Sequence, residues 1–471
     1  MEFKSDIVIG LECHVQLNTA SKLFCSCPSQ EEGQSNTKCC PTCLGMPGSK
    51  PVVNKKAIDF GIKLSLATNS KIAKELIFSR KSYFYPDMAK DFQISQYEIP
   101  LSTEGSMKLK SGKEVNLKRI HMEEDPAALV HTGSIQSSPY VLVDYNRSGN
   151  PLLEIVTEPE LESPEEARDF MNRLITVLQY LEIFNLDSCI VKADANISLK
   201  ESGYQRVEVK NITGFKEIER ALFYEVERQK QELKEGKKIV QETRAWDSAK
   251  GTTFSLRTKE TEEDYGYTIE TDLVPIELTK GWLDEVRETL PELAQEKVKK
   301  FISKHKINKV DAEVIAQERL LAELFEKVAA EINPELAAKW LRRELMRVLH
   351  YNKKELHQLE IDETHLIDLL GLVESKQITD NVAKKLLEKL VEKPFDVKEY
   401  VKKEKLGKLS DSGEIEKICL ETIKENPQAV EDYKNGEAKA LNFIVGQVMR
   451  KTQGKADAEM VRRIVGDNIS S

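Results

Sequence analysis

The pattern of the sequence changes near Pro291, and this change limits the folds that the chain can adopt. Before it, short runs of alternating apolar and polar residues, such as Ile7–Leu17, indicate strands. After it, Lys, Glu, Leu and Ala recur at helical spacing, and glycine and strand signals nearly vanish. We therefore predict an α+β fold, in which a large mixed α/β cradle domain (1–292) precedes two small all-helical domains (293–394 and 395–471). Lys393-Pro394-Phe395 is the expected hinge between the helical domains.

The first domain contains further recognisable elements. Ser163-Pro164-Glu165-Glu166 combines a helix N-cap, a first-turn proline and a capping-box glutamate, so a helix is expected to begin here. A second helix is expected from Gly214 to Leu233. Beyond the first strand, strands are expected at Tyr140–Val143, Leu152–Val156, Ala193–Leu199, Gln205–Val209 and Thr253–Leu256.

Composition narrows the class of protein. With 32% charged and 40% hydrophobic residues, the chain reads as a soluble globular protein, and no stretch approaches the roughly 20 apolar residues that span a bilayer. The first nine residues are too few and too charged for a signal peptide, so a cytoplasmic location is expected. The net charge of -9 argues against a wholly basic nucleic-acid coat, although a local basic face is compatible with it.

Six of the eight cysteines lie before residue 44, an uneven placement that favours a metal over disulfides. Cys25-x-Cys27 and Cys40-x-x-Cys43 form two close pairs, the spacing of a structural zinc site with four thiolate ligands. Cys39 could replace Cys40, and unrelated buried or free thiols are the alternative. Cys13 lies on the opposite strand face from His14 and is expected in the core.

Acidic residues and one histidine suggest a second metal site. Glu12 and His14 share a strand face, Glu123 and Glu124 follow a histidine, and Glu154 lies in a separate strand. Carboxylates that converge from separate strands repel one another unless a cation lies between them, and oxygen ligands favour Mg²⁺ or Mn²⁺. Solvated surface acids are the alternative.

Two segments could meet phosphate: Arg80–Tyr85 interleaves cations with aromatic residues, and Arg147 lies in a turn. The phosphate cradle G-x-x-x-x-G-K-[ST], the dinucleotide motif G-x-G-x-x-G and the hydrolase elbow G-x-S-x-G are all missing from the sequence. A nucleotide would therefore be held by a metal together with side chains.

Taken together, these segments resemble the B subunit of the tRNA-dependent amidotransferases (GatB). The resemblance covers the whole chain and includes long literal strings. They are Ile9–Leu17, Phe24–Cys27, Asn36–Gly48, Arg80–Asp87, Gln93–Tyr97, His121–Asp125, Val143–Glu154, Glu242–Trp246, Phe443–Met449 and Lys455-Ala456.

The resemblance implies an ATP-dependent ligase that uses glutamine as amido donor. It would phosphorylate the side-chain carboxylate of Asp-tRNA(Asn) or Glu-tRNA(Gln) and then replace the phosphate with ammonia. The implied cofactors are ATP as substrate, Mg²⁺ and structural Zn²⁺. The implied partners are the family's amidase, its A subunit, which releases the ammonia, a small C subunit, and the misacylated tRNA, which the YqeY-like tail would bind.

The resemblance also implies roles for particular residues. The expected Mg²⁺ ligands are Glu12, His14, Glu124 and Glu154, with Glu123 as a further catalytic residue and the main rival of Glu124. Contacts to phosphate or to the acceptor end are expected from Lys81, Ser82, Tyr83 and Arg147. The expected Zn²⁺ ligands are Cys25, Cys27, Cys40 and Cys43.

The sequence departs from the family pattern at two places. Ala128 stands where many bacterial members have a lysine, and Gly266 stands for an arginine within the string Asp264–Asp272. Both changes indicate an archaeal-type or diverged member, and 471 residues leave no room for the inserted domain of the related archaeal protein. Two other functions are the alternatives: a tRNA-binding scaffold that has lost catalysis, and an amide ligase acting on a free amino acid.

Overall fold

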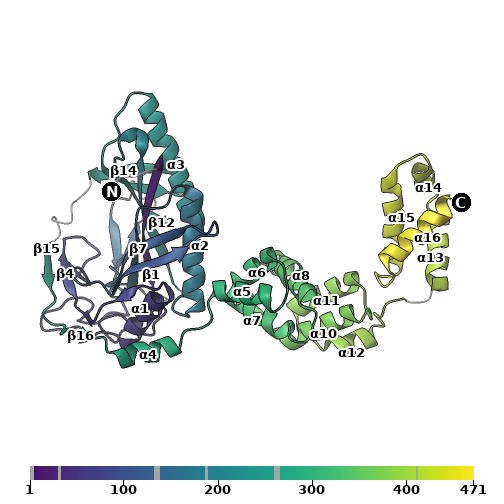
Figure 1. Cartoon of the computed structure of the whole chain (residues 1–471), viewed down its shortest axis with the longest axis horizontal. Coiled ribbons are helices and arrows are strands. Elements are labelled where there is room, and N and C mark those ends of the chain that lie inside the picture. The colour runs from purple at the N-terminus through teal and green to yellow at the C-terminus, as the bar shows by residue number, and fades with distance from the viewer. Residues whose placement is uncertain are drawn as a thin grey trace. The chain divides into compact units, whose positions relative to one another are not determined.

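The computed structural model describes residues 5–29, 33–131, 138–185, 189–258, 266–409 and 412–470. The chain forms two compact units, Met1–Leu293 and Ala294–Ser471, each described by itself (Figure 1). The first unit is a mixed sheet domain and the second is helical, which confirms the predicted fold class. The division of the chain into three domains stays a prediction.

The centre of the first unit is a large sheet. Its strand order over the described residues is β14-β13-β12-β11-β1-β10-β7-β6-β2. Neighbouring strands pair antiparallel, except β12 and β13, which are parallel. The strands are β1 (Ile7–Gln16), β2 (Lys71–Ile72), β6 (Ser102–Lys108), β7 (Glu114–Glu124), β10 (Pro151–Thr157), β11 (Val191–Leu199), β12 (Val207–Thr213), β13 (Glu242–Asp247) and β14 (Thr252–Thr258).

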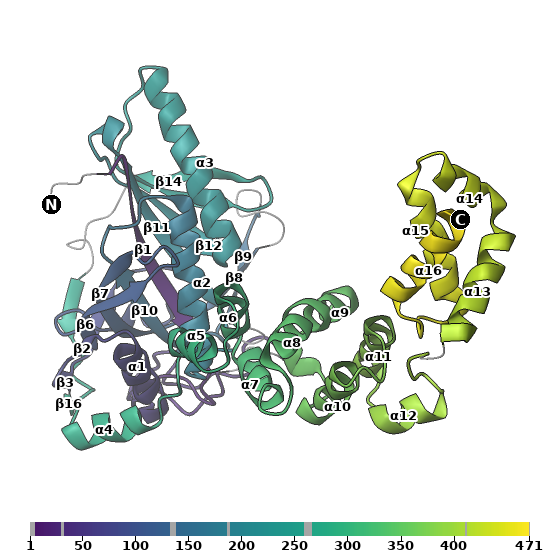
Figure 2. The ribbon, with the colours of Figure 1, turned by 45° about the vertical axis from the view of Figure 1, so that its right-hand side comes forward.

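The two faces of this sheet differ in polarity because apolar and polar residues alternate along its strands. On β1, Leu11, Cys13 and Val15 are fully buried in the core, which confirms the prediction for Cys13. Helices α1 (Lys55–Ala67), α2 (Pro164–Tyr180) and α3 (Phe215–Lys234) contribute buried side chains to the same core. Figures 1 and 2 show α2 and α3 along one side of the sheet. The residues in between, including His14, point to the other face, which we call the polar face.

Local sequence signals explain where α2 begins. The Ser163 hydroxyl accepts a hydrogen bond from the backbone N–H of Glu166 at 3.2 Å, and Pro164 occupies the first turn, as predicted. The predicted capping box is wrong, because the Glu166 carboxylate accepts from the N–H of Glu162 at 2.9 Å. The Glu166 side chain therefore accepts from the residue before the N-cap, so a backbone donor at the start of the helix is still hydrogen-bonded.

All six expected strand segments are strands in the structure, with ends shifted by a few residues. The one expected at Tyr140–Val143 is β9 (Val141–Asp144), which lies outside the large sheet. The helix expected from Gly214 is α3. Smaller sheets and one helix complete the unit. They are β15-β4-β5 (Gly266–Ile269, Ser79–Ser82, Phe92–Ser95), β16-β3 (Ile276–Glu277, Glu75–Leu76), β8-β9 (β8 is Ala128–His131) and α4 (Lys280–Glu288). Asp264 and Tyr265, the first residues of the diverged string, lie outside the described residues.

The second unit consists of helices. α12 is joined to α10 by an ion pair between Lys398 and Asp368 at 2.6 Å, and helices α13 to α16 enclose a core of their own around Cys419 and Ile444. The helices are α5 (Ala294–Ser303), α6 (Lys309–Ala316), α7 (Arg319–Val328), α8 (Pro334–Lys339), the π-helical η3 (Trp340–Leu345), α9 (Met346–Asn352), α10 (Glu363–Glu374), α11 (Asp380–Glu392), α12 (Val397–Lys403), α13 (Ser412–Glu425), α14 (Pro427–Lys434), α15 (Ala438–Lys451) and α16 (Ala458–Ser470). Within the described part of the chain, no helix has both the length and the apolar character needed to cross a membrane.

Candidate functional site

The register of four neighbouring strands aligns polar residues in one row across the polar face. His14 on β1 pairs with Glu154 on β10 and with Lys192 on β11, and Glu154 pairs in turn with His121 on β7. Side chains of directly paired residues stand on the same face of a sheet, about 5 Å apart at Cβ. The row therefore gathers two imidazoles, a carboxylate and an ammonium from segments far apart in the sequence.

Three side chains of this face form a group that could hold a metal ion. Ligand atoms of His14, Glu123 and Glu154 all lie within 4.8 Å of one another. His14 Nδ1 is 2.8 Å from Glu123 Oε1, and His121 Nε2 is 3.3 Å from Glu154 Oε2. One imidazole and two carboxylates suit Mg²⁺ or Mn²⁺. The donor set therefore fits the ion that the sequence predicts.

Ion pairs hold this group together. Burial opposes a charge on His14, but the Glu123 carboxylate, with Glu154 nearby, outweighs burial and raises the pKa of His14 to about 10. Burial alone would raise the pKa of Glu154, yet the charges of His121 and His14 hold it well below its usual range. His14 is therefore protonated in the metal-free protein at neutral pH, and a metal bound there would displace that proton.

Glu12 lies beside this group on the same face. Burial, followed by the charge of Glu154, raises the pKa of Glu12, and the Asn196 amide donates to its Oε1 at 2.9 Å. Nearby, Lys210 Nζ is 2.8 Å from Asp194 Oδ2. No motif in the sequence pointed to Asp194, Asn196 and Lys210. The signal that could have revealed the first two is the polar residue at every second position of β11.

Glu124 is not part of this metal group. Its carboxylate accepts from the backbone N–H of Ile94 at 2.8 Å and forms a buried ion pair with Lys90. Both charged side chains line a cavity of about 290 Å³ beside the cysteine loop. The neighbouring Glu123, the alternative to Glu124 that the sequence left open, is the glutamate of β7 that joins the group.

The expected phosphate contacts lie in two places. Lys81, Ser82 and Tyr83 lie on or next to β4, with Lys81 Nζ 5.8 Å from the centre of the Tyr83 ring. Arg147 donates through Nε and Nη2 to the carbonyl oxygens of Pro126 (3.0 Å) and Ala127 (2.7 Å). The Arg147 guanidinium is thus engaged with backbone next to Ala128, the first residue of β8.

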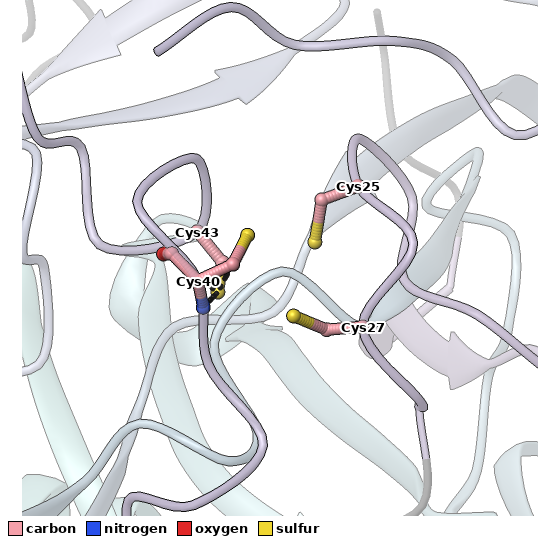
Figure 3. A group of neighbouring side chains, drawn as sticks. All are labelled: Cys25, Cys27, Cys40 and Cys43. Atoms are coloured by element: carbon pink, nitrogen blue, oxygen red, sulfur yellow. Dashed lines mark hydrogen bonds between the residues drawn. The ribbon is translucent and has the colours of Figure 1, made fainter.

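The four predicted zinc ligands come together from two loops, with their sulfur atoms turned toward one another (Figure 3). All four sulfur atoms lie within 4.8 Å of one another, and those of Cys40 and Cys43 are 3.9 Å apart. Tetrahedral Zn–S bonds of about 2.3 Å place sulfur atoms roughly 3.8 Å apart, so the group fits zinc. Cys39 lies outside the group, and its thiol donates to the carbonyl oxygen of Asn36 at 3.2 Å.

A buried lysine supports the cysteine group. The Lys22 ammonium is fully buried, donates to the carbonyl oxygens of Lys38 (2.9 Å) and Tyr145 (3.3 Å), and lies 3.7 Å from Cys43 Sγ. A hydrogen bond from Cys25 and the Lys22 charge outweigh burial and lower the pKa of Cys43 to about 5. A thiolate, the form that binds metal, is thus present at neutral pH.

Comparisons with known proteins cover both units of the chain. A family profile described as "GatB/GatE catalytic domain" matches residues 7–284, and one described as "GatB domain" matches residues 323–469. Three relatives are named as the B subunit of an aspartyl/glutamyl-tRNA(Asn/Gln) amidotransferase. The protein of Carboxydothermus hydrogenoformans is 41% identical over 475 residues, with 99% of both chains covered. That of Caldanaerobacter subterraneus is 41% identical over 477 residues, covering 99% of this chain and 100% of the relative. That of Thermodesulfovibrio yellowstonii is 40% identical over 470 residues, with 98% of both chains covered.

These matches confirm the resemblance drawn from the motifs. They include the segment that carries His14, Glu123 and Glu154 and the cysteine group as well as most of the helical unit. This chain belongs to the GatB family of aspartyl/glutamyl-tRNA amidotransferase B subunits.

Proposed function

We propose that this protein is the component that activates and amidates the misacylated amino acid on Asp-tRNA(Asn), Glu-tRNA(Gln) or both. A side-chain carboxylate is anionic and has no usable leaving group, so ammonia does not displace its oxygen directly. In the proposed reaction, a carboxylate oxygen attacks the terminal phosphorus of ATP and ADP leaves. Ammonia then attacks the acyl phosphate carbon and inorganic phosphate leaves, which gives Asn-tRNA(Asn) or Gln-tRNA(Gln).

The observation that carries this proposal is the group formed by His14, Glu123 and Glu154 on the polar face. We infer that these three residues hold Mg²⁺, with Glu12 beside them. When bound, Mg²⁺ neutralises phosphate charge and aligns the oxygens for in-line transfer. The protein residues fix the ligand atoms in place: Glu123 orients the His14 ring, and His121 orients the Glu154 carboxylate.

The cysteine group has a separate, structural role in this proposal. Cys25, Cys27, Cys40 and Cys43 would hold Zn²⁺ and so join two loops that carry little secondary structure. Closed sites of four thiolates stabilise a fold and leave no open position for a substrate. Zinc would therefore act on stability and not on the chemical step.

Partners complete the proposed reaction. The sequence carries no glutaminase signature, so we propose that the amidase, the A subunit of the family, releases ammonia from glutamine and that a small C subunit completes a heterotrimer. The helical tail would bind the tRNA, and the assembly would work in the cytoplasm, where aminoacyl-tRNA is used.

The proposal is tested with the reconstituted heterotrimer, supplied with ATP, Mg²⁺ and ammonium chloride and with each misacylated tRNA in turn. We expect amide formation on at least one of the two tRNAs. Glu154→Gln should reduce amidation at least 100-fold, because it removes a metal ligand from the group, while the glutaminase activity of the partner stays measurable. Glu227→Gln, at an exposed position of α3, is the matched control.

Three results would contradict the proposal. Near-normal amidation by Glu154→Gln would remove the metal group from the reaction. If the wild-type complex binds both misacylated tRNAs but amidates neither, only a tRNA-binding scaffold remains. Amide formation on free aspartate without tRNA would instead indicate a ligase for free amino acids.

A further inference from the structure

Lys192 lies on the polar face, next to the metal group in the strand register. It lies on β11 directly opposite His14 in the strand register, so both side chains stand on the same face. Its side chain is half-buried, while the flanking Val191 and Ala193 are buried in the core. Across the parts of the chain that the structure describes, no carboxylate forms an ion pair with its ammonium. Among the described residues, a cation next to the metal group is thus left without a counter-ion.

Two other cations lie near the metal group, Arg119 on β7 and Lys210 on β12, and both are already paired with carboxylates. Lys210 Nζ contacts Asp194 Oδ2 at 2.8 Å and Glu208 Oε1 at 3.3 Å. Arg119 Nη2 lies 3.9 Å from Glu154 Oε1. Both side chains balance carboxylates of the site, so neither charge is fully available for a ligand.

The negative charge of the site favours an additional cation that is free to contact a ligand. Five carboxylates gather around the metal group or beside it, and a triphosphate brings further negative charge. They are Glu12, Glu123, Glu154, Asp194 and Glu208. Enzymes that transfer phosphoryl groups commonly use a lysine or arginine together with the metal ion to neutralise phosphate charge. This chain has no phosphate-binding loop that would supply such a lysine.

We propose that Lys192 is a catalytic residue that contacts the terminal phosphoryl group of ATP during its transfer. This proposal rests on the proposed function and names one more residue of the same site. As the bond between the carboxylate oxygen and phosphorus forms and the bond to the ADP oxygen breaks, negative charge spreads over the equatorial phosphoryl oxygens. The Lys192 ammonium keeps its proton and donates hydrogen bonds to those oxygens, and ADP leaves with the electron pair of the broken bond.

The test compares Lys192→Met and Lys192→Arg in the reconstituted complex, using the misacylated tRNA that the wild-type complex amidates. Lys216→Met is the matched control, since Lys216 is exposed on α3, which packs on the opposite, apolar face. We measure kcat and the KM for ATP in ammonium-dependent amidation, Mn²⁺ affinity by titration, and glutaminase activity of the partner.

We expect Lys192→Met to lower kcat by about 100-fold or more, the usual effect of removing one group that stabilises the transition state. Lys192→Arg should restore most of the rate, because the charge and the donors remain. Mn²⁺ affinity and glutaminase activity should match those of Lys216→Met in every variant.

Each other outcome overturns a specific claim. Wild-type activity in Lys192→Met would refute the role of Lys192 and leave the proposed function intact. A parallel loss of Mn²⁺ affinity, or no rescue by arginine, would show that Lys192 only supports the fold of the site. Failure of the wild-type complex itself would refute the proposed function instead.

Discussion

Two adjacent glutamates of β7 have different environments because successive residues of a strand point in opposite directions. Glu123 reaches His14, whereas Glu124 pairs with Lys90. Since loss of a proposed metal ligand and loss of a buried ion-pair partner should have different effects, the two residues can be separated by experiment.

We predict that Glu123→Gln weakens Mn²⁺ binding at least tenfold, because one charged group of the proposed metal site is removed. Glu124→Gln should leave Mn²⁺ affinity unchanged and lower the free energy of unfolding by about 3 kcal/mol, because the Lys90 ammonium stays buried without its partner. Metal titration and urea unfolding check the pair. The reverse assignment, with Mn²⁺ affinity lost only in Glu124→Gln, would contradict the structure.

His14 links metal binding to pH. Its folded-state pKa is raised to about 10, above the ordinary value of 6.5, so its charge stabilises the metal-free fold fully below pH 6.5. This contribution is lost as the pH rises through about 10. Because a metal must displace the proton, Mn²⁺ affinity should rise by about tenfold per pH unit between pH 7 and 9. Titrations in this range check the slope, and His14→Gln should abolish it. A flat response in the wild-type protein would contradict the protonated state of His14.

Cys39 and Cys40 are neighbours in the sequence, but only Cys40 joins the group of four. Cys40→Ser should therefore lower the zinc content of the purified protein and its melting temperature, because it removes one of the four proposed ligands. Cys39→Ser is the control and should keep one zinc per chain. Metal analysis by mass spectrometry decides between them. Zinc loss in Cys39→Ser alone would contradict the geometry.

At the scale of elements, local patterns predicted much of the fold. The alternation in β1 predicted the strand face that enters the core, and the serine and proline before α2 marked its start. The cysteine spacing was sufficient to predict which four sulfur atoms come together, because the two cysteines of each pair are close in the sequence. These signals work since each depends on residues a few positions apart.

Contacts between distant segments were harder to predict. The choice between Glu123 and Glu124 depends on where β7 ends against β10, which no local pattern encodes. Asn196 reaches Glu12 only because β11 pairs with β1, although the two segments are separated by more than 170 residues. Lys210 lies opposite an irregularity in the pairing of β11 and β12, where a bulge re-aims side chains. The register of a sheet is a property of the whole domain.

Lys22 joins several loops at one point, since its ammonium donates to carbonyl oxygens of Lys38 and Tyr145 beside Cys43. Lys22→Met should lower the free energy of unfolding by about 1–3 kcal/mol, because buried acceptors lose their donor. Lys50→Met, whose side chain is 76% exposed, should change it by less than about 0.5 kcal/mol. Urea unfolding of both variants checks this difference. Equal stabilities would show that Lys22 does not connect the loops.

At the scale of the whole molecule, the site exists only because the sheet assembles. His14, Glu123 and Glu154 come from three strands, and the first and last of these residues are 140 positions apart in the sequence. Helices bury the opposite face. The helical unit, most of which matches the second family profile, has its own cores and adds no described residue to this group. The sheet domain should therefore carry the ion and the reacting phosphate, with the helical unit left for the tRNA.

The central claim is that this face binds a divalent ion between His14, Glu123 and Glu154. Anomalous X-ray diffraction from crystals grown with Mn²⁺ tests it most directly. We predict a peak within about 2.3 Å of a ligand atom from each of the three residues, which disappears in Glu154→Gln. Mn²⁺ bound only at other places in the protein, or no peak in this group at saturating Mn²⁺, would contradict the account.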